Sequence, residues 1–272
     1  MKKDAGGLPV AGAFWRRTLS ALVLLPLVLG AVWFGRPWLT IAVLIAGSAM
    51  AWEWGRLCGR QTSDSREFPL IVIMLAAIGL AASGYFVAAV VVAVVGAVAG
   101  GLLRPTEPLW AGMGMLWIAG GLIAFLWLAT PPQGGRETLL WLLGVVWATD
   151  ILAYAAGKTI GGPKLAPGLS PNKTWAGFAG GILGAMAMGG TFATLTPASS
   201  AFLIVASLGL SVVAQAGDLA ESQAKRHFGV KDSSGLIPGH GGFLDRLDGL
   251  IAASIASAML ALALGASPLE IR

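Results

Sequence analysis

Residues 85–103 read YFVAAVVVAVVGAVAGGLL, a run without a charged side chain. A bilayer core about 30 Å thick is crossed by roughly 20 apolar residues in α-helical form, so this run predicts a membrane-spanning helix. Its apolar residues are continuous and do not alternate with polar ones, which argues against a strand of a membrane β-barrel. Outward from this run, further apolar segments of helical length lie at about 18–35, 38–55, 69–83, 110–130, 138–157, 174–196, 200–217 and 249–265. The sequence therefore predicts an all-α, polytopic integral membrane protein with about nine transmembrane helices.

The overall composition excludes several classes of protein. Of the 272 residues, 56% are hydrophobic and 11% are charged, whereas about a quarter are charged in soluble domains, so a water-soluble monomer is excluded. The single cysteine, Cys58, cannot form an internal disulfide, and no Cys/His spacing matches a zinc site. The net charge of +5 would suit nucleic acid, but basic residues of membrane proteins chiefly set orientation and meet anionic headgroups. We expect contact with the lipid bilayer and none with nucleic acid.

The distribution of Lys and Arg predicts the orientation of the chain. A cytoplasmic N-terminus and nine spans would put fifteen of the 18 basic residues on the cytoplasmic side, with only Arg36, Arg136 and Arg272 opposite. This bias favours a cytoplasmic N-terminus and an odd number of spans. The first apolar run lacks a small-x-small cleavage site, so we expect it to be retained as a helix.

The two halves of the chain differ in polarity. Residues 1–137 consist of plain apolar helices, spans one to five, and short turns. Residues 138–272 carry two polar loops, 158–173 and 222–246, and most of the acids in or beside spans. We therefore expect a catalytic region in the second half, on the cytoplasmic side. The small-residue pairs Gly96-x-x-x-Gly100 and Gly180-x-x-x-Gly184 predict close helix packing.

Acidic residues inside a membrane helix are costly, at roughly 2.5–3.5 kcal/mol each, and are therefore functional candidates. Five of them gather in the second half: Asp150, Asp218, Glu221, Asp245 and Asp248. Asp218, Glu221, Ser222 and Lys225 recur at i, i+3, i+4 and i+7, which places them on one face of a helix. Such carboxylates could together hold a hard divalent cation such as Mg²⁺. The alternative, that they pair with Lys225 or Arg246 and hold helices together, is equally compatible with the sequence.

The segment between the last two spans has the composition of a phosphate-binding loop. Its glycines, Gly239, Gly241 and Gly242, allow backbone N–H groups to approach phosphate oxygens. Positive charge comes from Lys225, Arg226, Lys231 and Arg246. A basic cytoplasmic loop would explain the cations but not the glycines. His240 could be a general base, a phosphate donor or a loop histidine, whereas His227 is expected to face the surface.

The other polar loop offers further donors to phosphate. Ser170, Asn172, Lys173 and Thr174 could reach phosphates through hydroxyl, amide and ammonium groups. Alternatively, Ser170 or Asn172 caps the following helix. No Walker A motif is present. In the first half, Glu53 is expected to be an interfacial anchor or a partner of Arg56.

A long ordered motif links these residues. The run Ser222-x-x-Lys225-Arg226-x4-Lys231-Asp232-x4-Ile237-Pro238-Gly239-His240-Gly241-Gly242-Phe243-x-Asp245-Arg246-x-Asp248 resembles the signature of the phosphatidate cytidylyltransferases, or CDP-diacylglycerol synthases. Upstream, Asp150-x-x-Ala153-Tyr154-x-x-Gly157, Ser170-Pro171-x-Lys173-Thr174 and Gly217-Asp218-x-x-Glu221-Ser222 are also similar to that family, so the likeness covers about residues 145–250. Ala176, where an acid is expected, and Gly249, where Ser is common, depart from the pattern.

The resemblance implies transfer of a cytidylyl group from CTP to phosphatidate, with Mg²⁺ as cofactor. It implies metal ligands at Asp218, Asp245 and Asp248. Lys225, Arg226, Lys231 and Arg246 would act in catalysis by offsetting phosphate charge, with His240 shaping the pocket. The substrate-binding set would comprise Asp150, Ser170, Lys173, Thr174, Ser222, Asp232, Gly239, Gly241 and Gly242. We further expect a bacterial inner-membrane location and a homodimer.

Three alternatives are compatible with parts of the sequence. The motif Asp245-x-x-Asp248-Gly249 also begins the aspartate motif of the CDP-alcohol phosphotransferases. That family has Ala-Arg next, where this chain has Ala252-Ala253, and the later aspartates of the family's motif are absent from this chain. A related CTP-dependent enzyme acting on another lipid phosphate is not excluded by the loop residues. An ion-coupled transporter would need acids near the bilayer midplane, whereas these acids gather at helix ends.

Overall fold

The computed structural model describes residues 10–59, 65–131, 134–239 and 241–271, and the side chains from residue 22 onward. These residues form nine α-helices: α1 (Val10–Phe34), α2 (Trp38–Cys58), α3 (Glu67–Ala82), α4 (Phe86–Leu103), α5 (Pro108–Leu128), α6 (Gly135–Thr159), α7 (Trp175–Leu195), α8 (Ser200–His227) and α9 (Leu244–Leu264). A short 3₁₀ helix, η1 (Pro268–Glu270), follows. The predicted helical class is confirmed. Six of these helices, α4 to α9, are long and apolar enough to cross a membrane. The number of spans and the orientation stay predictions.

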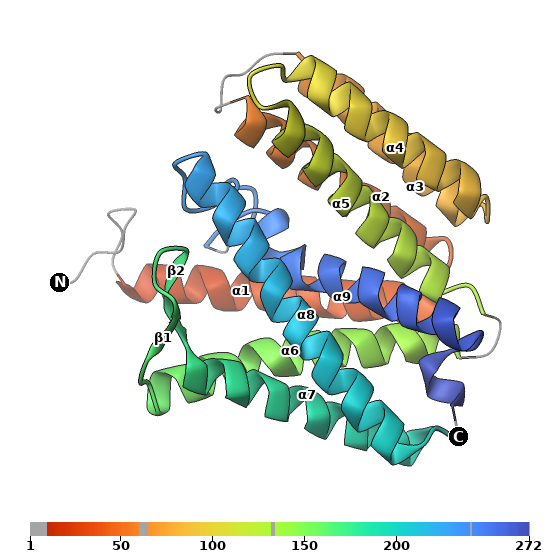
Figure 1. Cartoon of the computed structure of the whole chain (residues 1–272), viewed down its shortest axis with the longest axis vertical. Helices are drawn as coiled ribbons and strands as arrows, with labels where there is room; N and C mark the ends of the chain where they lie inside the picture. Colours follow the sequence, from red (N-terminus) through yellow and green to blue (C-terminus); the bar gives the residue numbers. More distant parts are fainter. Residues whose placement is uncertain (1–9, 60–64, 132–133, 240, 272) are drawn as a thin grey trace.

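Helix α9 joins two groups of helices. Helices α2 to α5 form one group, while α6, α7 and α8 form the other, and α9 lies between them against α5 and α8 (Figure 1). Large side chains of both groups, such as Met50, Leu70 and Trp141, are fully buried. The start of α9 is therefore surrounded by residues from both halves of the chain.

Glycines allow the closest helix contacts. A Cβ atom at Gly180 would lie 2.5 Å from the Ala156 Cβ, and one at Gly184 would lie 2.7 Å from the Ala148 carbonyl oxygen. In the other group, a Cβ at Gly96 would lie 2.9 Å from Ile73. These contacts confirm that both small-residue pairs serve helix packing.

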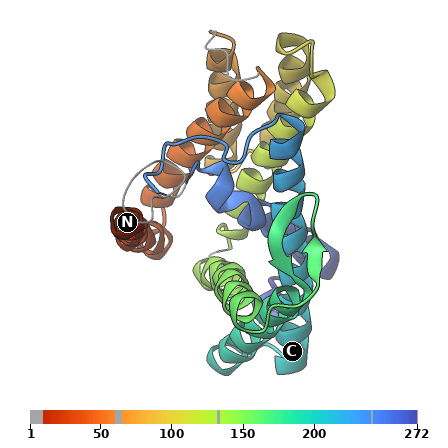
Figure 2. The same cartoon turned by 90° about the vertical axis from the view of Figure 1, so that its left-hand side faces the viewer.

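A β-hairpin between α6 and α7 was not predicted. Strands β1 (Lys164–Ala166) and β2 (Ser170–Thr174) are antiparallel, with Lys164 opposite Thr174 and Ala166 opposite Ser170. Strand β1 has only three residues and β2 is mostly polar, so neither shows the alternating pattern by which a strand is recognised. The hairpin lies beside α8 (Figure 2) and brings Lys173 near that helix.

Candidate active site

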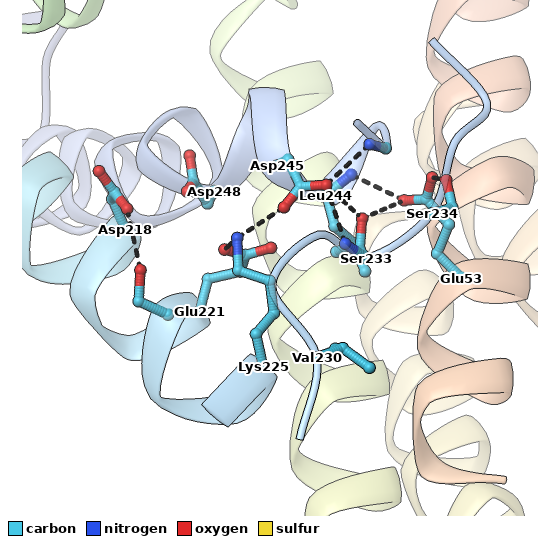
Figure 3. A network of polar contacts seen from close by, with 12 residues as sticks. Glu53, Asp218, Glu221, Lys225, Val230, Ser233, Ser234, Leu244, Asp245 and Asp248 are labelled. Carbon is cyan, nitrogen blue, oxygen red and sulfur yellow. Dashed lines mark hydrogen bonds and ion pairs between the residues drawn. The ribbon is translucent and has the colours of Figure 1, made fainter. Parts of the chain in front are cut away.

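Three carboxylates from α8 and α9 meet where the two helices lie side by side. One oxygen atom from each of Asp218, Glu221 and Asp248 lies within 4.8 Å of the others. Helical periodicity brings Asp218 and Glu221 together, and Asp248 comes from the second turn of α9 (Figure 3). Three carboxylate oxygens at this spacing form a donor set that suits a hard cation such as Mg²⁺.

Two lysines contact the same carboxylates. Lys173 Nζ lies 2.6 Å from Asp218 Oδ2, which brings the hairpin to the cluster. Lys225 Nζ contacts Glu221 and lies 2.5 Å from Asp245 Oδ1. The ion pairs with Lys225 that the sequence suggested are therefore present beside the carboxylate cluster, so a metal site and ion pairing are compatible.

Asp245 is held by the loop that precedes α9. Its Oδ2 accepts hydrogen bonds from Ser233 N at 2.9 Å, Ser233 Oγ at 2.8 Å and Gly242 N at 2.7 Å. Because Oδ1 faces Lys225, both oxygens of Asp245 have partners. The structure thus groups Glu221 with Asp218 and Asp248, and Asp245 binding a metal stays a prediction.

The glycines of this loop have a structural reason. Gly239 and Gly241 have φ values of +79° and +86°, which L-residues rarely adopt. A Cβ at Gly242 would lie 2.1 Å from Ser233 Oγ and 2.3 Å from Glu53 Oε1. The loop is tightened by an isolated bridge between Ile237 and Gly241. His240 lies outside the described residues.

The expected role of Glu53 as an interfacial anchor is wrong. Its side chain is fully buried, and it accepts hydrogen bonds from the backbone N–H groups of Phe243 and Leu244 at 2.9 and 2.8 Å. Ser234 Oγ donates a third bond at 2.5 Å. Arg56 instead lies over the ring of Trp52. The position of Glu53 inside an apolar span was a sequence signal for a functional role. Its partners could not be read from the sequence, because Phe243 and Leu244 lie about 190 residues away.

Several other predicted site residues gather around the cluster. Asp150 lies within electrostatic range of Asp218, Lys173 and Arg246, and its side chain is exposed. Ser222 Oγ lies 3.4 Å from Asp218 Oδ1, at the long end of hydrogen-bond distance. The structure therefore brings α6, the hairpin, α8 and α9 together at one site.

The remaining predicted residues have other contacts. Thr174 caps α7, accepting from Gly177 N at 3.0 Å, so the expected caps Ser170 and Asn172 are not used. Arg226 donates to the carbonyl oxygens of Leu169 and Val230. Ser170 begins β2, while Lys231 and Asp232 are exposed on the loop.

His227 is exposed, as predicted, and it also contacts protein on two sides. Its ring stacks on Trp110 with centroids 4.8 Å apart, and Nε2 lies 3.0 Å from Glu107 Oε2. The next residue, Phe228, meets Trp54 edge to face. The C-terminal end of α8 is thereby attached to α2 and α5.

Comparisons with known proteins show to which family the chain is similar. Residues 15–264 match the model of the cytidylyltransferase family. The chain is 40% identical to the phosphatidate cytidylyltransferase of Brucella abortus biovar 1 (strain 9-941) over 247 residues, covering 88% of this chain and 89% of the relative. It is 35% identical to that of Pseudomonas aeruginosa over 254 residues, covering 88% and 93%. The corresponding protein of Bacillus subtilis (strain 168) is 43% identical over 129 residues, covering 47% and 48%.

Proposed function

Because the chain belongs to the cytidylyltransferase family, we propose that it transfers a cytidylyl group from CTP to phosphatidate, giving CDP-diacylglycerol and pyrophosphate. It is a membrane nucleotidyltransferase of phospholipid biosynthesis. The observation that carries this proposal is the cluster of Asp218, Glu221 and Asp248, with Lys173 and Lys225 beside it, within the matched residues.

The reaction needs charge neutralisation more than proton transfer. The phosphate monoester of phosphatidate has a second pKa of about 6, so its oxygen is already largely a nucleophile near neutrality. That oxygen forms a bond to the α-phosphorus of CTP. The bond between the α-phosphorus and the oxygen that bridges it to the β-phosphate breaks, and pyrophosphate leaves. Several anionic groups meet in one place, which requires fixed positive charge.

The carboxylate cluster would hold Mg²⁺. Asp218, Glu221 and Asp248 supply the oxygens that this ion prefers. A cation held there would supply positive charge that offsets the negative charge of the CTP phosphates. Asp245 was also predicted as a metal ligand. Its Oδ1 would have to break the ion pair with Lys225 before it could bind the same ion as these three carboxylates.

Basic residues of the chain would position the substrates. Lys173 at the hairpin and Lys225 at the end of α8 flank the carboxylates from two sides. In our proposal they bind the phosphates of CTP and stabilise the leaving pyrophosphate, with Arg226, Lys231 and Arg246 assisting. The hairpin, the end of α8 and the start of α9 lie on one side of the molecule (Figure 1). We assign this side to the cytoplasm, where CTP is present and a lipid phosphate can approach from the leaflet. Assembly as a homodimer is part of the proposal.

The test is product formation by detergent-purified protein supplied with CTP, phosphatidate and Mg²⁺. We expect pyrophosphate release and a lipid-linked CMP product only when all three are present. Product with a different lipid phosphate, but not with phosphatidate, would support the related CTP-dependent enzyme. No product with any lipid phosphate, from protein that retains its cooperative melting transition, would refute the proposed function.

A further inference from the structure

Glu53 is a buried carboxylate far in sequence from the carboxylate cluster. It lies on α2, in the half of the chain that carries none of the predicted site residues. Within the described part of the chain, its hydrogen-bond partners belong to Ser233, Ser234, Phe243 and Leu244, none of which is a cation. A buried carboxylate is unfavourable unless hydrogen bonds replace its hydration. These partners all belong to the loop and the start of α9, so Glu53 holds this segment in place.

Glu53 and Asp245 bind the same segment from two sides. The backbone N–H groups of Gly242, Phe243 and Leu244 are consecutive, and Asp245 accepts the first while Glu53 accepts the other two. Ser233 Oγ lies between the two carboxylates, at 2.8 Å from Asp245 and 3.4 Å from Glu53. The first N–H groups of a helix have no partner within the helix and favour an anion. The start of α9 is therefore fixed by both carboxylates.

The contacts continue to the cluster. Asp245 Oδ1 lies 2.5 Å from Lys225 Nζ, and Lys225 also contacts Glu221. Figure 3 shows this sequence of contacts from Glu53 through Ser233 and Asp245 to Lys225. In Figure 2 the loop extends from α8 across to α2. A shift of Glu53 would therefore change where Asp245 and Lys225 lie.

Gly242 supports this interpretation independently. A side chain there would collide with Glu53 Oε1 and Ser233 Oγ, at 2.3 and 2.1 Å from its Cβ. By contrast, a Cβ at Gly235 in the same loop would meet no atom within 4 Å. The glycine at 242 is thus explained by the close approach of Glu53.

From these contacts we propose that Glu53 is a positioning residue, which places Asp245 and Lys225 for the reaction by holding the loop before α9. The inference rests on the proposed function. It assigns helix α2 a part in the active site, although α2 contributes no group that touches the cluster.

The variant Glu53→Gln tests the proposal. The glutamine side chain has nearly the same shape, but its NH₂ group cannot accept a hydrogen bond. Whichever way the amide is turned, either the Phe243 or the Leu244 N–H would therefore lose its acceptor. We expect kcat to fall by about tenfold or more, since misplacement of about 1 Å can cost a factor of about one hundred. The KM for CTP and for phosphatidate should change much less than kcat.

The matched control is Glu67→Gln. Glu67 is also buried, lies on the adjacent helix α3, and pairs with Arg104 at 2.9 Å without contacting the loop. It should lose thermal stability while keeping kcat. Equal kcat in Glu53→Gln and Glu67→Gln would overturn the proposal, as would a loss of kcat that follows the melting temperature in both.

Ser234→Ala decides the matter if Glu53→Gln does not fold. Ser234 is half-buried and donates to Glu53 at 2.5 Å, so its removal should lower kcat by a few-fold, and unchanged kcat would overturn the proposal. In a folded Glu53→Gln background it should cause little further loss, whereas additive losses would indicate separate roles. The wild type is measured in parallel: an inactive wild type refutes the proposed function, whereas an active wild type with fully active variants refutes only the positioning role.

Discussion

Replacing Lys225 by alanine removes the one ammonium group that contacts both Glu221 and Asp245 in the described site. The two carboxylates are 1% and 4% exposed, so water cannot replace the lost partner. Removing one member of a buried ion pair typically costs about 3–5 kcal/mol, because the remaining charge is left uncompensated. We expect Lys225→Ala to lose both stability and turnover.

Lys173→Ala is the comparison that makes this prediction quantitative. Lys173 and Asp218 are 25% and 36% exposed, so water can solvate the remaining carboxylate. A pair of this exposure contributes about 0–1 kcal/mol. The two variants should therefore differ by at least about 2 kcal/mol in the free energy of unfolding. By the scaling of soluble domains this corresponds to roughly 4–8 °C in Tm.

The assay follows thermal unfolding of detergent-purified protein by the fluorescence of its 11 tryptophans, together with CDP-diacylglycerol formation. Lys225→Ala should melt lower and lose nearly all turnover, whereas Lys173→Ala should melt near the wild type and keep measurable turnover. Adding Asp245→Asn to Lys225→Ala should recover part of the stability, because one unpaired carboxylate is removed. Equal Tm values for the two single variants would refute the reasoning from burial. Equal and complete loss of turnover would show that the hairpin lysine matters as much as Lys225.

Three further predictions concern the carboxylates and the loop. Asp245→Asn should abolish turnover while the protein still folds, because its contacts with Lys225 and the loop depend on the charge; near-normal activity would contradict this. Asp248→Asn should raise the Mg²⁺ concentration that gives half-maximal activity, and an unchanged Mg²⁺ titration would exclude Asp248 as a ligand. Gly242→Ala should lower both Tm and kcat, whereas Gly235→Ala should change neither, and similar values for the two would show that the space at Gly242 is unimportant.

The helices could be predicted from the sequence because a continuous apolar run has few other solutions in a membrane. Each predicted segment coincides with one helix, and periodicity alone placed Asp218 beside Glu221. The hairpin could not be predicted, because β1 has only three residues and β2 is mostly polar, so neither strand has a recognisable alternating pattern. Thr174 as a cap was missed for the same reason: the end of β2 decides where α7 begins.

The part of the site that could not be predicted depends on tertiary packing. Glu53 carries no local sign of its partners, since only the packing of α2 against the loop brings Phe243 and Leu244 to it. Asp245 was predicted as a ligand from its place in a motif, whereas its hydrogen bonds to Ser233 and Gly242 depend on the folded loop. Motif spacing therefore identifies candidate functional residues, but it does not predict which groups each of them contacts in the folded protein.

The attachment of the loop to α2 has a consequence for exchanging parts between relatives. A chimera that takes residues 138–272 from one relative and the preceding helices from another would receive every carboxylate of the cluster, yet its loop would meet a foreign α2. Unless that helix also carries an acid at the position of Glu53, the N–H groups of Phe243 and Leu244 would lose their acceptor in an apolar setting. Helix α2 and the segment 233–244 must therefore be exchanged together between relatives, although about 180 residues separate them in the sequence.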